Sequence, residues 1–202
     1  MRTLPCESIA TSPEFRHLST IDGLRIDLRY ASANNFMGRD MYSPLDCAWL
    51  HAEAAHGIEH AVAWLAKQRS DVTLCILDAL RPHRVQLAMW DALKNGDLQK
   101  YLAPPERGSI HSYGMAVDVT LLDANGDELD MGTGFDEMSE TSHPEHESQF
   151  LKTGDLTAEQ VANRHLLRDA MKASDFHGIA TEWWHFDCGD RVRVRNEFAR
   201  VV

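Results

Sequence analysis

Two short segments, residues 109–118 and 182–185, place the strongest constraint on how this chain can fold. They read Ser-Ile-His-Ser-Tyr-Gly-Met-Ala-Val-Asp and Glu-Trp-Trp-His. Two imidazoles and one carboxylate form a sufficient protein ligand set for a zinc ion that keeps its fourth position open for water. The candidate ligands are His111, Asp118 and His185. Glu182 then remains free to take a proton from that water, so the fold has to join these two distant segments.

The spacing within each segment requires a turn or a bend. His111 and Asp118 are seven positions apart, so a regular strand would point their side chains to opposite faces. Gly114 between them permits a sharp turn, and we expect His111 in a loop and Asp118 on the strand that follows. Glu182 and His185 are three positions apart, which is again the wrong parity for one face of a strand. We therefore expect a bulge or bend there.

The hydrophobic pattern predicts an α+β fold, with a mostly antiparallel sheet flanked by helices and the zinc site at the sheet. Strands are predicted at 24–30, 72–79, 115–122, 179–186 and 192–194, with a hairpin at Asn125-Gly126 leading into 128–131. Helices are predicted at 49–68, at 85–93 and, from the capping box of Thr157 and Gln160, up to about Ala173. The segments 95–108 and 132–155 are expected to be irregular.

Length and composition restrict the class of protein. The 202 residues fit one domain spanning 1–202. The formal charge of -11 argues against nucleic acid or an anionic membrane surface as a partner, because both select for basic patches. No apolar run approaches the roughly 20 residues that span a bilayer, and the first residues lack the apolar stretch of a secretory signal. We therefore expect a cytoplasmic protein, whose oligomeric state the sequence leaves open.

Two other histidine patterns compete for the metal. His56 and His60 match the HxxEH motif of inverted zinc peptidases and lie one helical turn apart. However, Gly57 lies inside the motif, no later helix offers the acidic third ligand, and the apolar positions of this helix occupy another face. We expect both imidazoles to face solvent. His143 and His146 lie in a polar loop and are a weaker candidate still.

The pattern SxHxxGxAxD followed by ExxH resembles that of the zinc D-Ala-D-Ala peptidase superfamily. Several segments, in the expected order between residues 27 and 186, are similar to D-alanyl-D-alanine dipeptidases of the vancomycin-resistance type. These segments are 27–36, Asp78-Ala-Leu-Arg-Pro82, 131–136 and Glu182-Trp-Trp-His185. The paired tryptophans and the Tyr-Ala…Asn-Phe segment favour the dipeptidases over the wider superfamily.

The resemblance implies hydrolysis of the small dipeptide D-Ala-D-Ala with one Zn²⁺ per chain. By this resemblance His111, Asp118 and His185 are the zinc ligands, Glu182 is the catalytic base, Arg81 stabilises the transition state, and Tyr30, Ser109 and Asp136 hold the amino end of the substrate. One departure is Ile110, which stands where the vancomycin-resistance type has a second serine near the substrate carboxylate. We therefore expect a difference in affinity or side-chain selectivity.

Other functions remain open at this point. A D,D-carboxypeptidase or peptidoglycan endopeptidase would apply the same metal chemistry to N-blocked or longer peptides. A non-catalytic zinc module would have no need for Glu182 and Arg81 together, and a metal-free structural domain would bind no zinc. The segment 132–150 is a candidate lid that would exclude longer chains.

Overall fold

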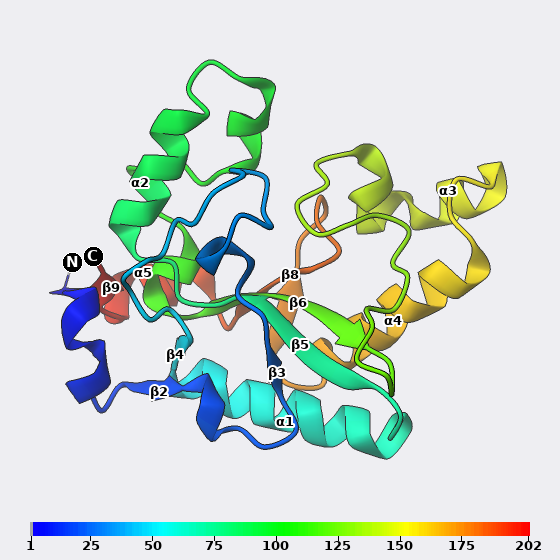
Figure 1. Cartoon of the computed structure of the whole chain (residues 1–202), viewed down its shortest axis with the longest axis horizontal. Coiled ribbons are helices and arrows are strands. Elements are labelled where there is room, and N and C mark those ends of the chain that lie inside the picture. Colours follow the sequence, from blue (N-terminus) through cyan, green and yellow to red (C-terminus); the bar gives the residue numbers. More distant parts are fainter. Residues whose placement is uncertain (1) are drawn as a thin grey trace.

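A five-stranded sheet runs through the molecule, and helices pack on its faces and ends (Figure 1). The structure is a computed structural model that describes residues 2–202. In spatial order the strands are β3 (Arg25–Ile26), β5 (Thr73–Asp78), β6 (Ala116–Leu122), β8 (His185–Cys188) and β7 (Phe176–Gly178). Within this sheet only β3 and β5 pair in parallel, so the predicted α+β fold with a mostly antiparallel sheet is confirmed.

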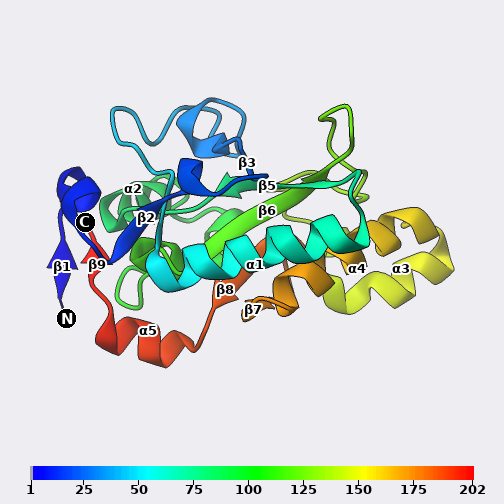
Figure 2. The same cartoon turned by 90° about the horizontal axis from the view of Figure 1, so that it is seen from below.

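The middle strand of the sheet, β6, is buried on both faces, and its alternating side chains separate the hydrophobic core from the candidate site. Every residue of β6 is buried. Val117, Val119 and Leu121 belong to the main hydrophobic core, together with α1 (Ala52–Gln68) and α4 (Ala158–Lys172). Seen from below, α1 crosses β5 and β6 with α4 beside it (Figure 2). Because successive side chains alternate, Asp118 points to the opposite face.

The remaining elements frame this centre. They are β1 (Thr3–Leu4) and β9 (Arg200–Val201), β2 (Phe15–His17) and β4 (Trp49–His51), α2 (His83–Ala92), α3 (Glu147–Thr153) and α5 (Arg191–Glu197). β1 pairs with β9 in parallel, which places the two ends of the chain side by side (Figure 1). The predicted capping box of α4 is confirmed, since both hydrogen bonds between Thr157 and Gln160 are present.

Several local predictions are wrong. Residues 192–194 form part of α5, because the Asp190 side chain accepts hydrogen bonds from two backbone N–H groups and caps a helix there. The stretch 132–155, predicted to be irregular, contains α3. Of the strand predicted at 24–30, only Arg25–Ile26 pairs with the sheet, and a 3-10 turn follows at Arg29–Ala31.

Two elements begin later than the sequence pattern predicts. The predicted helix 49–68 begins at Ala52, because residues 49–51 pair with β2 as a strand. The strand predicted at 179–186 begins only at His185, after a bend. Within residues 2–202, no helix is long and apolar enough to cross a membrane.

Candidate metal centre

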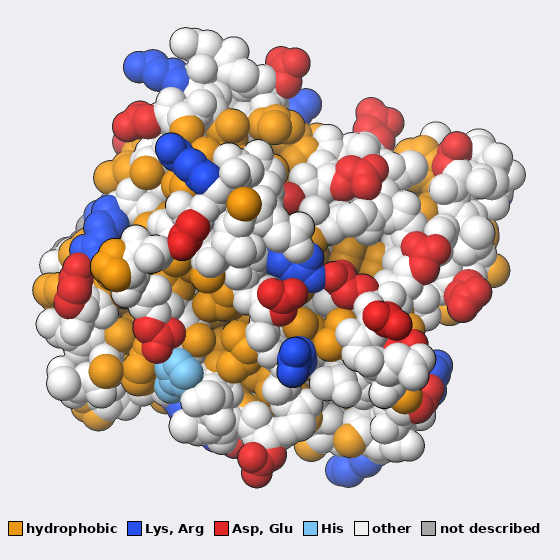
Figure 3. Space-filling view, in the orientation of Figure 1, with side chains coloured by type: hydrophobic (Ala, Val, Ile, Leu, Met, Phe, Trp, Pro, Cys, Tyr) orange, Lys and Arg blue, Asp and Glu red, His pale blue; other side chains and the backbone are white. Residues whose placement is uncertain are grey.

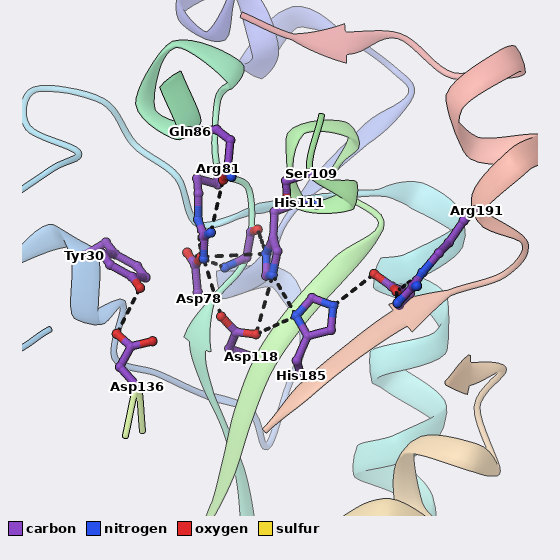
Figure 4. Close-up of polar contacts among 12 residues, drawn as sticks. Tyr30, Asp78, Arg81, Gln86, Ser109, His111, Asp118, Asp136, His185 and Arg191 are labelled. Carbon is purple, nitrogen blue, oxygen red and sulfur yellow. Dashed lines mark hydrogen bonds and ion pairs between the residues drawn. The ribbon is translucent and has the colours of Figure 1, made fainter. Parts of the chain in front are cut away.

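Three potential ligand atoms converge beside the sheet, from two distant parts of the chain (Figure 4). His111 comes from a 3-10 turn at Ile110–Tyr113, whereas Asp118 and His185 lie opposite each other on β6 and β8. His185 Nδ1 is 3.0 Å from Asp118 Oδ1 and 3.2 Å from His111 Nε2. His111 Nε2 is 3.5 Å from the same Asp118 oxygen. The fold thus joins the two segments that the sequence singles out.

These separations fit a small divalent ion. Tetrahedral ligands at roughly 2.0–2.1 Å from zinc lie about 3.3 Å from one another, and the three observed separations are 3.0, 3.2 and 3.5 Å. His111 and Asp118 are almost fully buried, so a charged carboxylate lies beside two imidazoles with little water around it. Such a donor set has the chemistry of a metal site.

The sharp turn predicted at Gly114 is confirmed. Its φ of 64° lies in the left-handed region, and its N–H donates to His111 O to close the 3-10 turn. A Cβ at this position would lie 2.8 Å from the backbone nitrogen of His51, so no other residue fits without a shift. At the other end of the turn, the Ser109 hydroxyl accepts from the backbone N–H of His111. Together these contacts aim the His111 ring at β6.

Each candidate histidine is oriented through its second ring nitrogen. His111 Nδ1 lies 2.8 Å from the carbonyl oxygen of Ala79, which assigns the proton to Nδ1 and leaves Nε2 free to bind a metal. His185 Nε2 lies 3.1 Å from Asp187 Oδ1, which leaves Nδ1 for the metal. Asp187 also accepts from Arg191. Burial opposes ionisation of Asp187, but His185 and Arg191 outweigh it and lower its pKa to about 2.

Glu182 lies on the bend that precedes β8. The predicted bend is confirmed, since Trp183 and Trp184 are buried anchors in a non-extended segment and the strand starts at the next residue. Burial raises the pKa of Glu182 to about 7, and Asp118 adds to the effect against the opposing charges of His185 and Arg81. A carboxyl group that titrates near neutral pH can both accept and return a proton.

Arg81 is held rigidly at the end of β5. Its Nε and Nη2 donate to Asp78 Oδ2 at 3.0 and 2.6 Å, and its Nη1 donates to Gln86 Oε1 at 3.2 Å. Its Nη2 lies 3.6 Å from Asp118 Oδ2, so the guanidinium faces the candidate ligands. Burial opposes its charge, but Asp78 and Tyr30 outweigh this and hold its pKa above the ordinary range. Arg81 is therefore a fixed positive charge.

Tyr30 and Asp136 form a second polar contact across the cavity. The Tyr30 hydroxyl donates to Asp136 Oδ2 at 2.9 Å, and the Arg81 guanidinium lies 4.9 Å from the centre of the Tyr30 ring. Asp136 has a φ of 62°, an unusual conformation for a residue with a side chain. Burial and the Asp118 charge raise its pKa well above the ordinary range. Its carboxyl group lacks a basic partner within ion-pair distance among residues 2–202.

One cavity of about 340 Å³ collects these groups. All eight residues predicted for the site line it: Tyr30, Arg81, Ser109, His111, Asp118, Asp136, Glu182 and His185. Its size is in the range of pockets for small ligands. On the face seen in Figure 1, acidic and basic side chains lie together near the middle, among hydrophobic ones (Figure 3).

Sequence reasoning missed the residues that orient this site. Asp78, Gln86 and Asp187 contact the predicted residues and lie buried. The sequence did contain a signal for Asp187. Residues two apart on a strand share a face, and His185 is two positions before Asp187. Gln86 had none, since its role depends on the direction in which the Arg81 side chain turns.

The rival histidine patterns do not form comparable sites. The His56 side chain is 67% exposed, and within residues 2–202 neither it nor His60 belongs to a group of three close potential ligands. His143, Glu145 and His146 do form such a group, with ligand atoms within 4.8 Å of one another, but Glu145 is exposed. The tighter and more buried set remains the stronger candidate.

Two imidazoles and a carboxylate beside a buried glutamate and arginine define a class of protein, the metal-dependent hydrolases. The chain belongs to the D-Ala-D-Ala dipeptidase family of peptidases, whose family model matches residues 14–202. It is therefore a metallopeptidase, and the resemblance inferred from the sequence motifs is confirmed.

Two relatives carry the name of this family. The chain is 38% identical to the D-alanyl-D-alanine dipeptidase of Escherichia coli (strain K12) over 164 residues, which cover 81% of this chain and 78% of the relative. It is 30% identical to the D-alanyl-D-alanine dipeptidase of Enterococcus faecium over 196 residues, covering 88% and 92%. Among solved structures, the LD-carboxypeptidase LdcB is similar over 93% of this chain and 75% of its own, with a TM-score of 0.48 and 16% identity.

Proposed function

We propose that this protein is a zinc-dependent dipeptidase that hydrolyses D-Ala-D-Ala to two D-alanines, in the cytoplasm. The observation that carries the proposal is the convergence of His111, Asp118 and His185 within 3.5 Å of one another, in the cavity that Glu182 also lines. The names of the relatives from E. coli and E. faecium support the substrate.

The candidate ligands would hold one zinc ion through His111 Nε2, His185 Nδ1 and Asp118 Oδ1. When bound, zinc would polarise the peptide carbonyl and lower the pKa of a water molecule at its open position. Glu182 accepts the proton of the attacking water and then donates it to the amine of the departing D-alanine. A pKa of about 7 in the metal-free chain places this group in the range where both transfers are accessible.

Arg81 stabilises the charge that develops on the carbonyl oxygen. Its guanidinium is fixed by Asp78 and Gln86 before the reaction begins, so little reorganisation is needed when the charge appears. Because Asp78 supplies the compensating carboxylate, Arg81 stays charged although it is buried.

The amino end of the dipeptide binds at Asp136. The positive charge of the ammonium group lowers the pKa of this carboxyl group again, so the ionised carboxylate accepts hydrogen bonds from the bound ammonium group. Tyr30 holds that carboxylate in place, and Ser109 lines the same cavity. A cavity of about 340 Å³ suits a dipeptide. Asp136 and Met138, which line it, come from the candidate lid at 132–150, and this placement would disfavour N-blocked or longer peptides.

The test combines metal content with release of D-alanine. The purified chain should contain one zinc ion and hydrolyse free D-Ala-D-Ala, and a chelator should abolish the hydrolysis. Glu182→Ala should keep the metal and lose about 10²–10⁴-fold in rate, whereas His185→Ala should lose both metal and activity. A metal-loaded Glu182→Ala variant with full turnover would contradict the role of the base. Equal hydrolysis of N-acetyl-D-Ala-D-Ala would favour a carboxypeptidase instead.

A further inference from the structure

Three arginines line the cavity on the side of His185. Arg191 and Arg195 lie on α5, and Arg107 lies in the loop that leads to the 3-10 turn of His111. We call these three residues the arginine wall. Figure 4 shows the pair of Tyr30 and Asp136 on one side of the candidate ligands and Arg191 on the other. The cavity is thus acidic at one end and basic at the other.

The basic charge of this wall is only partly compensated. Asp187 pairs with Arg191. Among residues 2–202, by contrast, no carboxylate lies within ion-pair distance of Arg107 or Arg195. This local excess of positive charge is unusual in a chain of net charge -11.

Backbone contacts hold Arg195 in place. Its Nε donates to the carbonyl oxygen of Arg107 at 3.3 Å, and its Nη2 donates to that of Gly108 at 3.4 Å. Its Nη1 donates to the carbonyl oxygen of Arg191 at 3.4 Å, so all three members of the wall are linked. Burial lowers the pKa of Arg195, and the charges of Arg107 and Arg191 lower it further. An anion between these guanidinium groups would relieve that repulsion.

Part of the cavity lining is apolar. Ile110, Ile179 and Ala180 line the same cavity, and their side chains offer no hydrogen bond to a ligand. A ligand that fits here carries an anionic group next to a small apolar substituent. The C-terminal residue of a short peptide has this chemistry, because it carries an α-carboxylate beside its side chain. Guanidinium groups match a carboxylate in geometry as well as in charge.

We propose that the arginine wall binds the free α-carboxylate of the C-terminal residue of the substrate. The dipeptide would then lie across the candidate metal centre, with its ammonium group at Asp136 and its carboxylate at Arg107 and Arg195. This assignment rests on the proposed dipeptidase activity and adds the direction in which the substrate binds. It makes a free C-terminus a requirement of the cavity itself.

The experiment compares D-Ala-D-Ala with its C-terminal amide, which removes the charge and keeps the shape. The wild-type protein should prefer the free acid by about 10- to 100-fold in kcat/KM, the usual effect of a hydrogen bond to a charged group. Arg107→Gln and Arg195→Gln should each lose about tenfold or more on the free acid, mainly through KM, and change little on the amide. Arg107→Gln is the variant less expected to disturb folding, because the Arg107 side chain makes no hydrogen bond or ion pair within residues 2–202.

Arg193→Gln is the matched control. Arg193 lies on α5, as Arg195 does, and its substitution removes the same positive charge. Its side chain, however, pairs with Glu53 and Glu197 outside this cavity. It should behave as the wild type with both substrates. Equal losses on acid and amide in the wall variants, or equal wild-type rates on the two substrates, would overturn the assignment and leave the dipeptidase activity intact. A wild-type protein that hydrolyses neither would overturn both proposals.

Discussion

Replacing Glu182 by glutamine should stabilise the metal-free protein above neutral pH. Burial raises the pKa of Glu182 from 4.5 to about 7 in the folded chain. Between these two pH values the folded state keeps a proton that the unfolded state has released, so the free energy of unfolding falls as the pH rises. Each unit of pKa difference between the folded and unfolded states corresponds to about 1.4 kcal/mol. The free energy of unfolding is therefore lower by about 3 kcal/mol above pH 7. Below pH 4 the carboxyl group is neutral in both states and the loss is absent.

The measurement is thermal unfolding of the wild-type protein and the Glu182→Gln variant at pH 5 and at pH 8, after removal of metal. It gives the difference in the free energy of unfolding between the two proteins. A stabilisation of about 3 kcal/mol corresponds to a Tm increase of roughly 6–12 °C at pH 8 for a domain of this size. At pH 5 the two proteins should differ by about 1 kcal/mol or less. Glu106→Gln, an exposed glutamate in a loop, is the control and should change stability little at either pH.

The result that would refute the reasoning is a glutamine variant no more stable than the wild type at pH 8. It would mean that Glu182 is solvated or paired in the folded chain. Restoring the metal provides a second readout, because a cation beside the carboxylate lowers its pKa. The advantage of glutamine should therefore shrink in the loaded protein.

Two further substitutions test how the candidate ligands are held. Asp187→Ala should weaken zinc binding about 10- to 100-fold in a competition assay with a chelator, because His185 loses the carboxylate that fixes its ring; wild-type affinity would show that this hydrogen bond is dispensable. Gly114→Ala should be more destabilising in urea than Gly126→Ala. Both glycines have positive φ, but only at Gly114 would the new Cβ lie 2.8 Å from backbone, so equal losses would discount the close approach to His51.

Predictions succeeded where the physical cause is local in the sequence. The turn at Gly114 follows from parity and from the conformational freedom of glycine, and β5 follows from the apolar run Leu74-Cys75-Ile76-Leu77. The failure at 192–194 has the opposite origin. Val-Arg-Val alternates as a strand would, but Asp190 caps a helix and only Val194 of the three is buried. A capping hydrogen bond outweighed a two-residue period that was too short to be decisive.

Long-range partners explain what the sequence could not predict about the site. Asp78 lies three positions before Arg81, yet its role depends on Tyr42, whose hydroxyl also donates to it. Arg107 and Arg195 are 88 positions apart and meet only because α5 packs on the turn that carries His111. The net charge is also a sum over the whole chain. An acidic total therefore gave no indication that three arginines line one side of the cavity. Because a ligand senses charge over a few ångströms, the local arrangement decides which end of a dipeptide binds where.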